Sequence, residues 1–480
     1  MNTLSLEIAV VALGIVLLLV EAYSDRSNKN YLSYLGAAGL FGVLVLSFFP
    51  MHAPATGTPA SAFITQDILS VFFVRFTLIA TIVTLLMIPG YRPVLERYLP
   101  AERAGGGIGE FSILPLFVCA GLMWMVSSVN FIMIFVSLEL ATITLYILAT
   151  YLRQNTASLE AGTKFLILGA LSTGFIVYGI SWIFGTTGTT NLLALPAAIS
   201  TLPASAITPL LFGIAMVLVA LSFKISAFPF QFWVPDVYQG APTPVTSYLS
   251  VASKAAGFVV LIRLLAALGT VPVISHKLQV VITLLAALTL IFGNFAAIPQ
   301  TNMKRLLGYS SIAHAGYLLM GVASLGSRLA IPAIGFYLAG YLAMTMLSFV
   351  VLTVVSEATG GDEISRFNGL GRRSPLLAGA MLLAAASLAG IPFTAGFIGK
   401  LLIFEVALNQ GHYGLVMLGC VTVAAGFYYY FKVIRAMYWQ QPAEEGPIPV
   451  SLTVKLLIAF LGAGILAFGI YPAPILAALR

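Results

Sequence analysis

The chain has 480 residues, of which 60% are hydrophobic and only 8% are charged, and its mean hydropathy is +1.02. This composition excludes an ordinary soluble domain and indicates that lipid is the main solvent. The net charge is +7, but the 23 Lys and Arg stand singly or in small groups at the ends of apolar runs, which argues against nucleic-acid binding. Cys119 and Cys420 lie far apart in apolar runs, so they predict neither a disulfide framework nor a metal site.

Fourteen apolar runs follow one another along the chain and predict an all-α membrane protein of about fourteen transmembrane helices, forming one domain over residues 1–480. The first run carries Glu7 and lacks the basic start of a signal peptide, so we interpret it as a first span. The runs cover residues 4–22, 32–49, 67–89, 111–127, 130–150, 161–184, 207–240, 243–267, 274–298, 304–323, 331–356, 376–410, 413–438 and 452–472.

Positive charge is distributed unevenly between successive loops. Loops after even-numbered runs contain only Lys277 and Arg328, and segments 50–66 and 185–206 contain no Lys or Arg. Loops after odd-numbered runs contain Arg26, Lys29, Arg92, Arg97, Arg103, Arg153, Lys304, Arg305, Arg366, Arg372 and Arg373, with Lys432, Arg435 and Lys455 near the last of them. Because cytoplasmic loops retain Lys and Arg, the loops after odd-numbered runs are predicted to lie inside and both termini outside.

Two apolar runs are too long for one straight crossing. Runs 207–240 and 376–410 each have about 35 residues, whereas about 20 are enough to cross a bilayer. Pro229 and Pro235 lie within the first and Pro392 within the second, and proline removes a backbone donor and clashes with the preceding helical turn. The seventh and twelfth spans are therefore predicted to be broken helices, with the breaks facing protein or a water-filled cavity.

The two predicted breaks are five spans apart, and an odd offset reverses the direction of the chain. Spans 4–8, residues 111–267, and spans 9–13, residues 274–438, are therefore predicted to form two inverted-topology repeats of five helices. Ion carriers use this arrangement to build a site at the middle of the membrane.

Four ionisable residues lie where the membrane core is predicted. Glu139 is nine residues into its run, roughly 14 Å deep, and Lys254 is eleven residues into its run, so both lie near the middle of a core about 30 Å thick. Lys224 precedes the Pro229 break and Lys400 follows the Pro392 break. A charge at the bilayer centre costs at least about 2.5–3.5 kcal/mol, which indicates a function. The alternatives are a structural ion pair for Glu139 and Lys254, and snorkelling for the other two lysines.

Two further residues are weaker candidates. Lys164 is only a few residues into its run, so a snorkelling lysine explains it nearly as well as a role in a relay. His314 has polar neighbours and can change its charge near neutral pH, but a lone histidine on a helix is as often a packing residue. One acid and several lysines suit protons better than a metal ion or a sugar, because burial and neighbouring charges change how strongly such groups hold a proton.

The motifs around these residues resemble the antiporter-like membrane subunits of respiratory complex I, NADH:quinone oxidoreductase, and most closely the subunit N type. The resemblance covers nearly the whole chain, although Phe393 stands where the family often has a second proline. In this family three paralogous subunits lie side by side. The eighth span of this chain lacks the histidine that the other two paralogues usually carry, and no lateral helix follows the last span. The motifs are Ser137-Leu138-Glu139-Leu140, residues 160–165, 223–230, 233–238, 240–246, 253–257 and 304–314, and Ala389-Gly390-Ile391-Pro392 to Gly399-Lys400.

The resemblance implies roles for the four residues of the membrane core. It makes Glu139 and Lys224 an acid–lysine pair, Lys254 the central relay and Lys400 the lysine on the outlet side. It also implies a multi-pass protein of a bacterial inner membrane that contacts the lipid bilayer, protons and other membrane subunits of complex I, including its antiporter-like paralogues. No cofactor or metal is expected in this chain; NAD, FMN, iron–sulfur clusters and quinone are expected in other subunits.

Two other functions stay open on the sequence. A cation/proton antiporter of the same fold would have the same intramembrane residues, and co-purification with NADH dehydrogenase activity would distinguish the two. A purely structural membrane anchor is the second alternative, and the four charges near the midplane argue against it because apolar residues would serve an anchor better.

Overall fold

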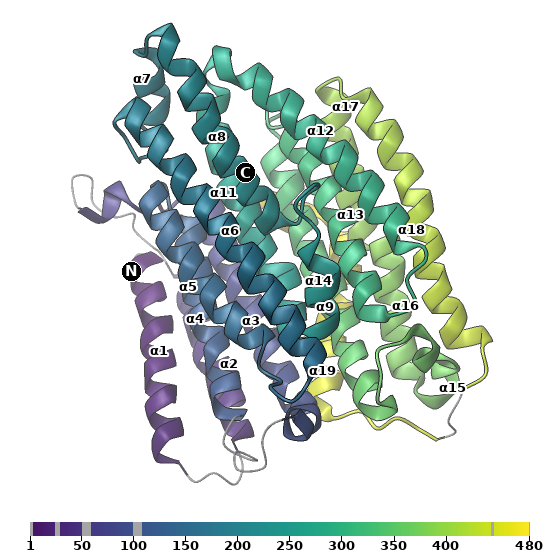
Figure 1. The fold of residues 1–480 in the computed structure, drawn as a ribbon. Coiled ribbons are helices and arrows are strands. Elements are labelled where there is room, and N and C mark those ends of the chain that lie inside the picture. Colours follow the sequence, from purple (N-terminus) through teal and green to yellow (C-terminus); the bar gives the residue numbers. More distant parts are fainter. Residues whose placement is uncertain (1–2, 25–28, 50–58, 99–107, 443–445, 480) are drawn as a thin grey trace.

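The computed structural model describes residues 3–24, 29–49, 59–98, 108–442 and 446–479. Arg26, Arg103 and most of segment 50–66 lie outside the described residues. Long helices cross the molecule side by side in alternating directions (Figure 1). The membrane helices are α1 (Thr3–Tyr23), α2 (Asn30–Leu46), α3 (Ile68–Tyr98), α4 (Ile108–Ser127), α5 (Phe131–Ala149), α6 (Thr156–Thr187), α8 (Ala204–Ile225), α9 (Trp233–Gly240), α10 (Thr243–Tyr248), α11 (Lys254–Gly269), α12 (Pro272–Ala297), α13 (Met303–Ala323), α14 (Ala330–Thr359), α16 (Pro375–Ala389), α17 (Ala395–Asn409), α18 (Tyr413–Trp439) and α19 (Leu452–Ile470).

The predicted all-α membrane fold is confirmed. Within the described ranges, twelve helical segments are long and apolar enough to cross a membrane, and α2 and α16 are shorter apolar helices that complete fourteen spans. Each predicted run coincides with one helix, or with consecutive helical pieces in the seventh, eighth and twelfth spans. Short helices α7 (Leu195–Ser200) and α15 (Leu370–Arg373) lie in the connections between spans, and α20 (Ala473–Ala477) follows the last span.

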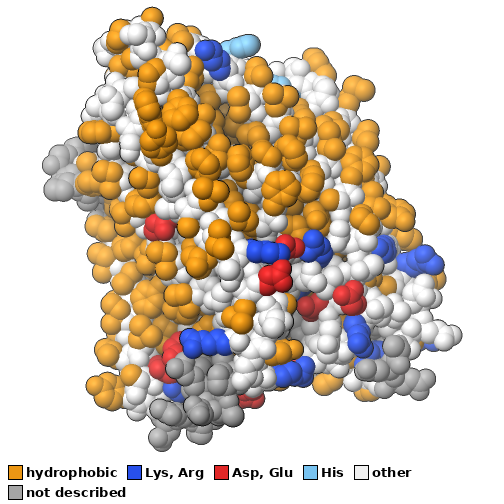
Figure 2. All heavy atoms as spheres, viewed as in Figure 1, with side chains coloured by type: hydrophobic (Ala, Val, Ile, Leu, Met, Phe, Trp, Pro, Cys, Tyr) orange, Lys and Arg blue, Asp and Glu red, His pale blue; other side chains and the backbone are white. Residues whose placement is uncertain are grey.

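Helices with polar residues lie at the centre of the bundle, and helices that are apolar on most sides lie at its outer surface. Helix α13 is less hydrophobic than the other spans and carries serines and His314, yet it is almost completely buried at the centre together with α14. Helices α1, α6 and α18 are apolar on most sides and expose large side chains. On the face seen in Figure 2, hydrophobic side chains cover most of the helices, and charged side chains gather across the lower part. Polar groups inside and apolar groups outside are what a lipid solvent requires.

Both predicted breaks exist. In the seventh span α8 ends at Ile225, and the chain is not helical again until α9 begins at Trp233, with Pro229 in between. In the twelfth span α16 ends at Ala389 and α17 begins at Ala395, with Pro392 in between.

One detail of the breaks differs from the expectation. Pro235 is not part of the first break, because it lies in the first turn of α9, where the backbone N–H has no helical partner to lose. In the second break Gly390 has φ +93° and ends α16 in the left-handed conformation that glycine adopts freely. Phe393 also has a positive φ, +67°, a strained conformation for a bulky residue.

The eighth span is irregular, which the sequence did not indicate. Between α10 and α11 the backbone forms a π-helical turn, η3 (Leu249–Ser253), and Lys254 is the first residue after it. No proline or glycine lies within this turn, so neither of the usual helix-breaking residues predicts it. π-Helical turns inside membrane helices are rare and are frequent at functional sites.

Glycines allow two pairs of helices to approach closely. A Cβ atom placed on Gly179 of α6 would lie 2.7 Å from the carbonyl oxygen of Gly213 on α8, and one on Gly213 would lie 2.9 Å from the carbonyl oxygen of Gly179. A Cβ on Gly293 of α12 would lie 2.4 Å from the backbone nitrogen of Ala313 on α13. Small residues at such crossings let helix backbones touch, which is how membrane helices gain packing energy in lipid.

The close α6–α8 crossing predicts that alanine has opposite effects on stability at two glycines of α6. Gly179→Ala should separate α6 from α8 and destabilise the protein by about 1–3 kcal/mol, as overpacking does. Gly174→Ala is the control, because a Cβ on Gly174 meets nothing within 4 Å and alanine favours the helix. Thermal unfolding of the solubilised protein should therefore show a lower midpoint for Gly179→Ala only. Equal midpoints for the two variants would contradict the close crossing.

Candidate functional site

The acid of the predicted pair is Glu139, which lies midway along α5 and is partly buried. Its Oε1 accepts a hydrogen bond of 2.7 Å from the hydroxyl of Thr173 on α6. No ion pair among the described residues includes Glu139. The carboxylate is therefore held by a neutral hydroxyl rather than by a cation.

Lys224 lies in the last turn of α8, just before the first break, and is buried. Its ammonium donates a hydrogen bond of 2.9 Å to Oγ1 of Thr142. Thr142 follows Glu139 by three residues on α5, so both face the same side of that helix. Lys224 lies within electrostatic range of the Glu139 carboxylate. The structure thus brings the two predicted residues into one neighbourhood, with Lys224 bonded to Thr142, three residues after Glu139 on α5.

Lys254 is 1% exposed, and its neighbourhood adjoins that of Lys224. A Cβ on Gly257, one turn after Lys254, would lie 3.2 Å from Cγ of Lys224. The aliphatic stem of Lys224 therefore packs against α11 beside Lys254, although no hydrogen bond among the described residues joins the two ammonium groups.

The Lys254 ammonium is held by one residue of α13. It donates a hydrogen bond of 2.6 Å to the carbonyl oxygen of Ser311 and a second one to the hydroxyl oxygen of the same serine. That hydroxyl also accepts a hydrogen bond of 2.9 Å from Tyr341 on α14 and lies 3.1 Å from the hydroxyl of Tyr238 on α9. A serine hydroxyl has one proton and two lone pairs, so Ser311 donates to Tyr238. Lys254, Ser311 and two tyrosines form one buried network.

His314 extends this network by one turn of α13. Its Nδ1 lies 2.7 Å from the hydroxyl of Tyr337 on α14, and its Nε2 lies 3.3 Å from the hydroxyl of Tyr430 on α18. Its ring also contacts the ring of Tyr341, which is bonded to Ser311. His314 is therefore fully bonded and central, and it belongs to the same network as Lys254.

Lys400 lies at the second break, as the sequence suggested. Its ammonium donates hydrogen bonds of 2.9 and 2.7 Å to the carbonyl oxygens of Leu388 and Ala389, which the end of α16 leaves without helical partners. The ammonium also lies 5.2 Å from the ring centre of Tyr317 on α13. At the first break the carbonyl oxygen of Phe223 accepts a hydrogen bond from the indole of Trp233 instead.

Lys164 lies apart from these residues. Its side chain is about two fifths exposed and forms ion pairs with Glu160 (2.6 Å) and Asp236 (2.8 Å), and Asp236 in turn pairs with Arg305. This is a network near the ends of α6 and α9. Five of the six predicted residues lie in the interior: Glu139, Lys224, Lys254 and Lys400, which we call the row, and His314 beside it. Lys164 belongs to the surface network.

The residues that sequence reasoning missed are the hydroxyls around the charges. Thr142, Thr173, Ser311, Tyr238, Tyr341, Tyr337 and Tyr430 each bond to a predicted residue or to its partner. A signal existed for two of them, because Thr142 is three residues after Glu139 and Ser311 is three residues before His314, which places each on the same helical face. The tyrosines come from distant helices and had no such signal.

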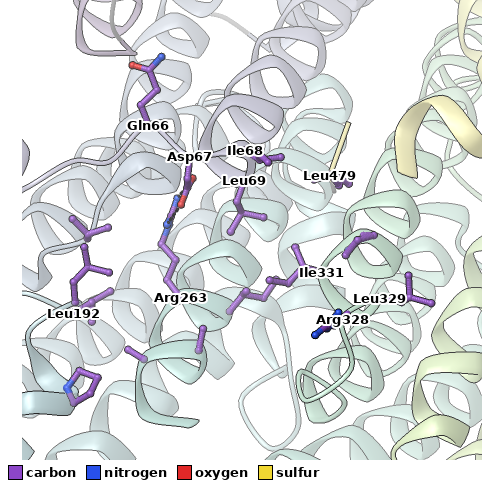
Figure 3. Close-up of a pocket in the computed structure, with 17 residues that line it drawn as sticks. Gln66, Asp67, Ile68, Leu69, Leu192, Arg263, Arg328, Leu329, Ile331 and Leu479 are labelled. Carbon is purple, nitrogen blue, oxygen red and sulfur yellow. Dashed lines mark hydrogen bonds and ion pairs between the residues drawn. The ribbon is translucent and has the colours of Figure 1, made fainter. Parts of the chain in front are cut away.

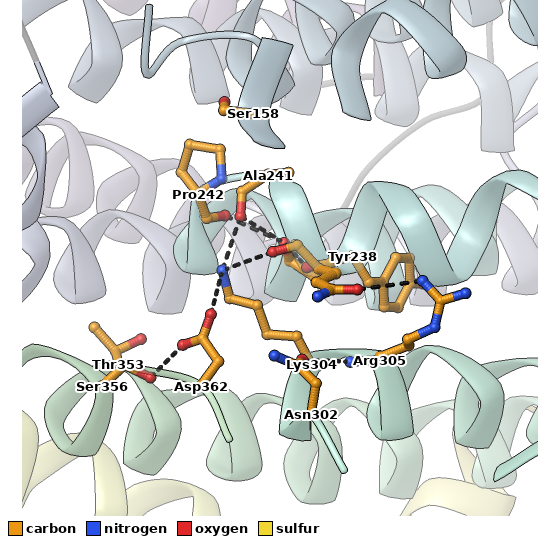
Figure 4. Close-up of polar contacts among 12 residues, drawn as sticks. Ser158, Tyr238, Ala241, Pro242, Asn302, Lys304, Arg305, Thr353, Ser356 and Asp362 are labelled. Atoms are coloured by element: carbon orange, nitrogen blue, oxygen red, sulfur yellow. Dashed lines mark hydrogen bonds and ion pairs between the residues drawn. The ribbon is translucent and has the colours of Figure 1, made fainter. Parts of the chain in front are cut away.

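A second polar cluster surrounds the start of α13. Lys304, at the start of α13, donates a hydrogen bond of 3.0 Å to the carbonyl oxygen of Ala241 and lies 3.3 Å from Asp362 (Figure 4). Lys304 and Asp362 also line a cavity of about 240 Å³ that includes Gln239 and Thr243. Buried serines follow Thr243 at positions 247 and 250 of the same span, before Lys254.

A larger cavity of about 930 Å³ opens on the other face and is not part of this site. In Figure 3 Asp67 and Arg263 point toward each other across it, and Arg263 donates hydrogen bonds of 2.7 and 2.8 Å to the two carboxylate oxygens. Its lining includes none of the predicted residues. Within the described ranges, no group of three or more His, Cys, Asp and Glu side chains is arranged to hold a metal ion.

The chain is similar to membrane subunits of known complexes over its whole length. Residues 128–426 match the family model described as NADH:quinone oxidoreductase/Mrp antiporter, transmembrane. NADH-quinone oxidoreductase subunit N of Heliobacterium modesticaldum is 39% identical over 99% of this chain and 97% of its own length. The same subunit of Moorella thermoacetica is 38% identical over 99% and 96%.

Solved structures agree with these relatives. A chain of respiratory complex I from Thermus thermophilus with bound aureothin has a TM-score of 0.81 and 30% identity, over 99% of both chains. A chain of the Mrp complex from Dietzia has a TM-score of 0.83 over 99% of this chain and 95% of that one, and its 19% identity supports the fold alone. The chain therefore belongs to the family of NADH:quinone oxidoreductase and Mrp antiporter membrane subunits, and within it to the NADH-quinone oxidoreductase subunit N group.

Proposed function

We propose that this chain is a proton-translocating, antiporter-like subunit of NADH:quinone oxidoreductase, in which quinone reduction in other subunits drives proton transfer across the membrane. The observation that carries the proposal is a row of ionisable side chains, from the partly buried Glu139 through the buried Lys224 and Lys254 to the buried Lys400. The row lies inside a protein that presents apolar side chains outward. A charge at this depth costs free energy, which indicates that each of these residues has a function.

The charges and hydrogen-bond partners around each lysine support proton transfer along the row. Opposite or like charges that move within a low-dielectric interior change the energy of a neighbouring ammonium strongly. A charge change at Glu139 therefore acts on Lys224, whose side chain packs against α11 one turn from Lys254. When Lys254 is neutral, its amine can accept a hydrogen bond from the Ser311 hydroxyl, so both protonation states of the lysine have a partner.

Hydroxyl groups and His314 support transfer beyond the lysines. Tyr341, His314 and Tyr337 continue from Ser311, and the ring of Tyr337 packs against the backbone of α17 at Gly399, next to Lys400. Among the described residues, the buried hydroxyls of Ser247 and Ser253 have no hydrogen-bond partner, and such groups are normally satisfied by internal water. Water at these two serines would connect the polar cluster at Lys304 with Lys254.

The setting of the chain is proposed on the same basis. NAD, FMN, iron–sulfur clusters and quinone belong to other subunits, and the partners are the other membrane subunits of complex I and its antiporter-like paralogues. Spans 4–8 (residues 111–267) and 9–13 (residues 274–438) are two inverted repeats, and the position of the breaks supports this because the fourth span of each set is the broken one. The face with Lys304 is cytoplasmic, and both termini lie outside.

Glu139 and Lys224 should act as a coupled pair in transport. Glu139→Gln and Lys224→Ala should each lower the protons taken up by inverted membrane vesicles per NADH oxidised, because each removes one charge of the row. The double variant should lose less than the sum of the two, with a coupling of about 0.5–3 kcal/mol in transport rate. Native gels would verify assembly of the complex.

Glu405→Gln is the control, because Glu405 is an exposed acid on α17. Its proton yield should stay normal. Normal yields from Glu139→Gln and Lys224→Ala in an assembled complex would exclude both residues from the path. Loss of NADH dehydrogenase activity from preparations that retain this chain would favour a separate cation/proton antiporter, and normal transport in all variants would favour a structural anchor.

The orientation predicts which loops an impermeant thiol reagent reaches. In a variant with Cys119 and Cys420 replaced by alanine, a cysteine at Thr201, before α8, should react from outside, and one at Gln441, after α18, from the cytoplasm. Seven spans separate the two positions, so they lie on opposite faces. Labelling of intact cells and of inverted vesicles measures this. The reverse pattern would mean that the charge bias was misread, and reaction from one side at both positions would contradict the count of crossings.

A further inference from the structure

A groove on the outer surface of the bundle exposes the otherwise buried α14. It lies between α3 and α19, has a volume of about 520 Å³ and is lined largely by phenylalanine and small apolar side chains. Ala339 is one of the few partly exposed positions of α14, and Phe460 of α19 is mostly exposed beside it. The volume lies within the range of about 300–1,000 Å³ that small-molecule sites have.

The depth of the groove matches one leaflet of a bilayer. It extends from Phe72 to Ile79 on α3, and Ile79 lies eleven residues from the start of that helix, or roughly 16 Å at 1.5 Å per residue. On α19 it extends from Phe468, near the end of the helix, back to Phe460. Half of a hydrocarbon core about 30 Å thick is about 15 Å, so the groove runs from one membrane surface to the midplane.

Among the described residues that line the groove, Arg75 is the only cation. Arg75 of α3 lines it and reaches the end of α2, where its Nη2 donates a hydrogen bond of 2.6 Å to the carbonyl oxygen of Ser47 and its Nε one of 3.2 Å to the serine hydroxyl. The guanidinium lies 4.1 Å from the ring centre of Phe48. None of the ion pairs among the described residues includes Arg75, and its Nη1 donates to no described residue.

We propose that this groove is a binding site for a membrane phospholipid, with the phosphate at Arg75 and one acyl chain along Phe76, Ala343 and Phe460. The charge supports this occupant, because a phosphate supplies the anion that the guanidinium lacks and accepts from its free N–H groups. The apolar walls of one-leaflet depth suit an acyl chain. Neither a quinone tail nor an apolar helix of a neighbouring subunit would neutralise Arg75. The inference does not depend on proton transport.

Photo-crosslinking in native membranes tests the site. Vesicles that contain the intact complex would be loaded with phosphatidylglycerol carrying a diazirine in one acyl chain, irradiated, and the labelled residues mapped by mass spectrometry. Labelling should concentrate on residues 72–79 and 460–468. The lipid-facing side of α18 gives the reference for ordinary lipid contact. Diacylglycerol with the same diazirine chain should label the groove no more than α18, because it has no phosphate.

Two variants separate the charge from the shape of the groove. Arg75→Gln keeps a polar side chain near Ser47 but removes the cation, and it should reduce groove labelling relative to α18 at least about tenfold, as loss of a charge-assisted hydrogen bond predicts. Ala339→Phe should block the groove and reduce labelling while Arg75 stays in place. Equal labelling by both lipids, or labelling unchanged in Arg75→Gln, would overturn the proposal. Crosslinks from these residues to another subunit in place of lipid would also overturn it.

Discussion

The cost of placing an ammonium group in the middle of a membrane governs the design of this chain. An unsolvated charge at that depth is not tolerated, so each buried lysine must find oxygen atoms within the protein. Lys400 uses the carbonyls that the end of α16 leaves free, Lys254 uses Ser311, and Lys224 uses the hydroxyl of Thr142. The irregular backbone serves this need, because each of the three lysines lies at or next to an interruption of its helix: a break for Lys224 and Lys400, and a π-helical turn for Lys254.

The same requirement explains why the centre of the bundle is polar. Helix α13 supplies Ser311 and His314, and the tyrosines around them come from α9, α14 and α18. Hydroxyl groups suit a site whose charge changes, because each can donate or accept a hydrogen bond, whereas a carboxylate beside Lys254 would fix it in the charged state. Glu139 is the one acid of the row and is held by a threonine, which leaves its charge available to act on Lys224.

Much of the architecture could be predicted from the sequence because lipid imposes simple rules. Apolar runs of fixed length gave the fourteen spans, and the excess length of two runs, together with Pro229 and Pro392, gave the breaks. Depth along a helix identified Glu139, Lys224, Lys254 and Lys400 as unusual without any knowledge of their partners. Lys164 was ambiguous for the same reason, since depth alone does not show the acids Glu160 and Asp236 that hold it near the surface.

The rest depended on tertiary packing. The π-helical turn before Lys254 contains no proline or glycine from which it could be predicted. Pro235 lies in the first turn of α9 rather than in the break. The partners of His314 come from helices that are adjacent only in the folded chain. The resemblance implied a pairing of Glu139 with Lys224, but it gave no sign that the hydroxyl of Thr142 accepts the hydrogen bond of the Lys224 ammonium. Side-chain geometry of this kind follows from how helices are rotated against one another, which hydrophobic periodicity does not specify when every face is apolar.

The central claim is that Lys254 takes up and releases a proton, and Lys254→Arg tests it most directly. Arginine keeps the positive charge and can still donate to Ser311, but it does not lose its proton in proteins. The measurement is proton uptake by inverted vesicles per NADH oxidised, with assembly of the complex verified on native gels and Lys254→Met as the variant without charge. The account predicts a reduced proton yield in both variants. A normal yield in an assembled Lys254→Arg complex would contradict it and would make Lys254 a fixed counter-charge.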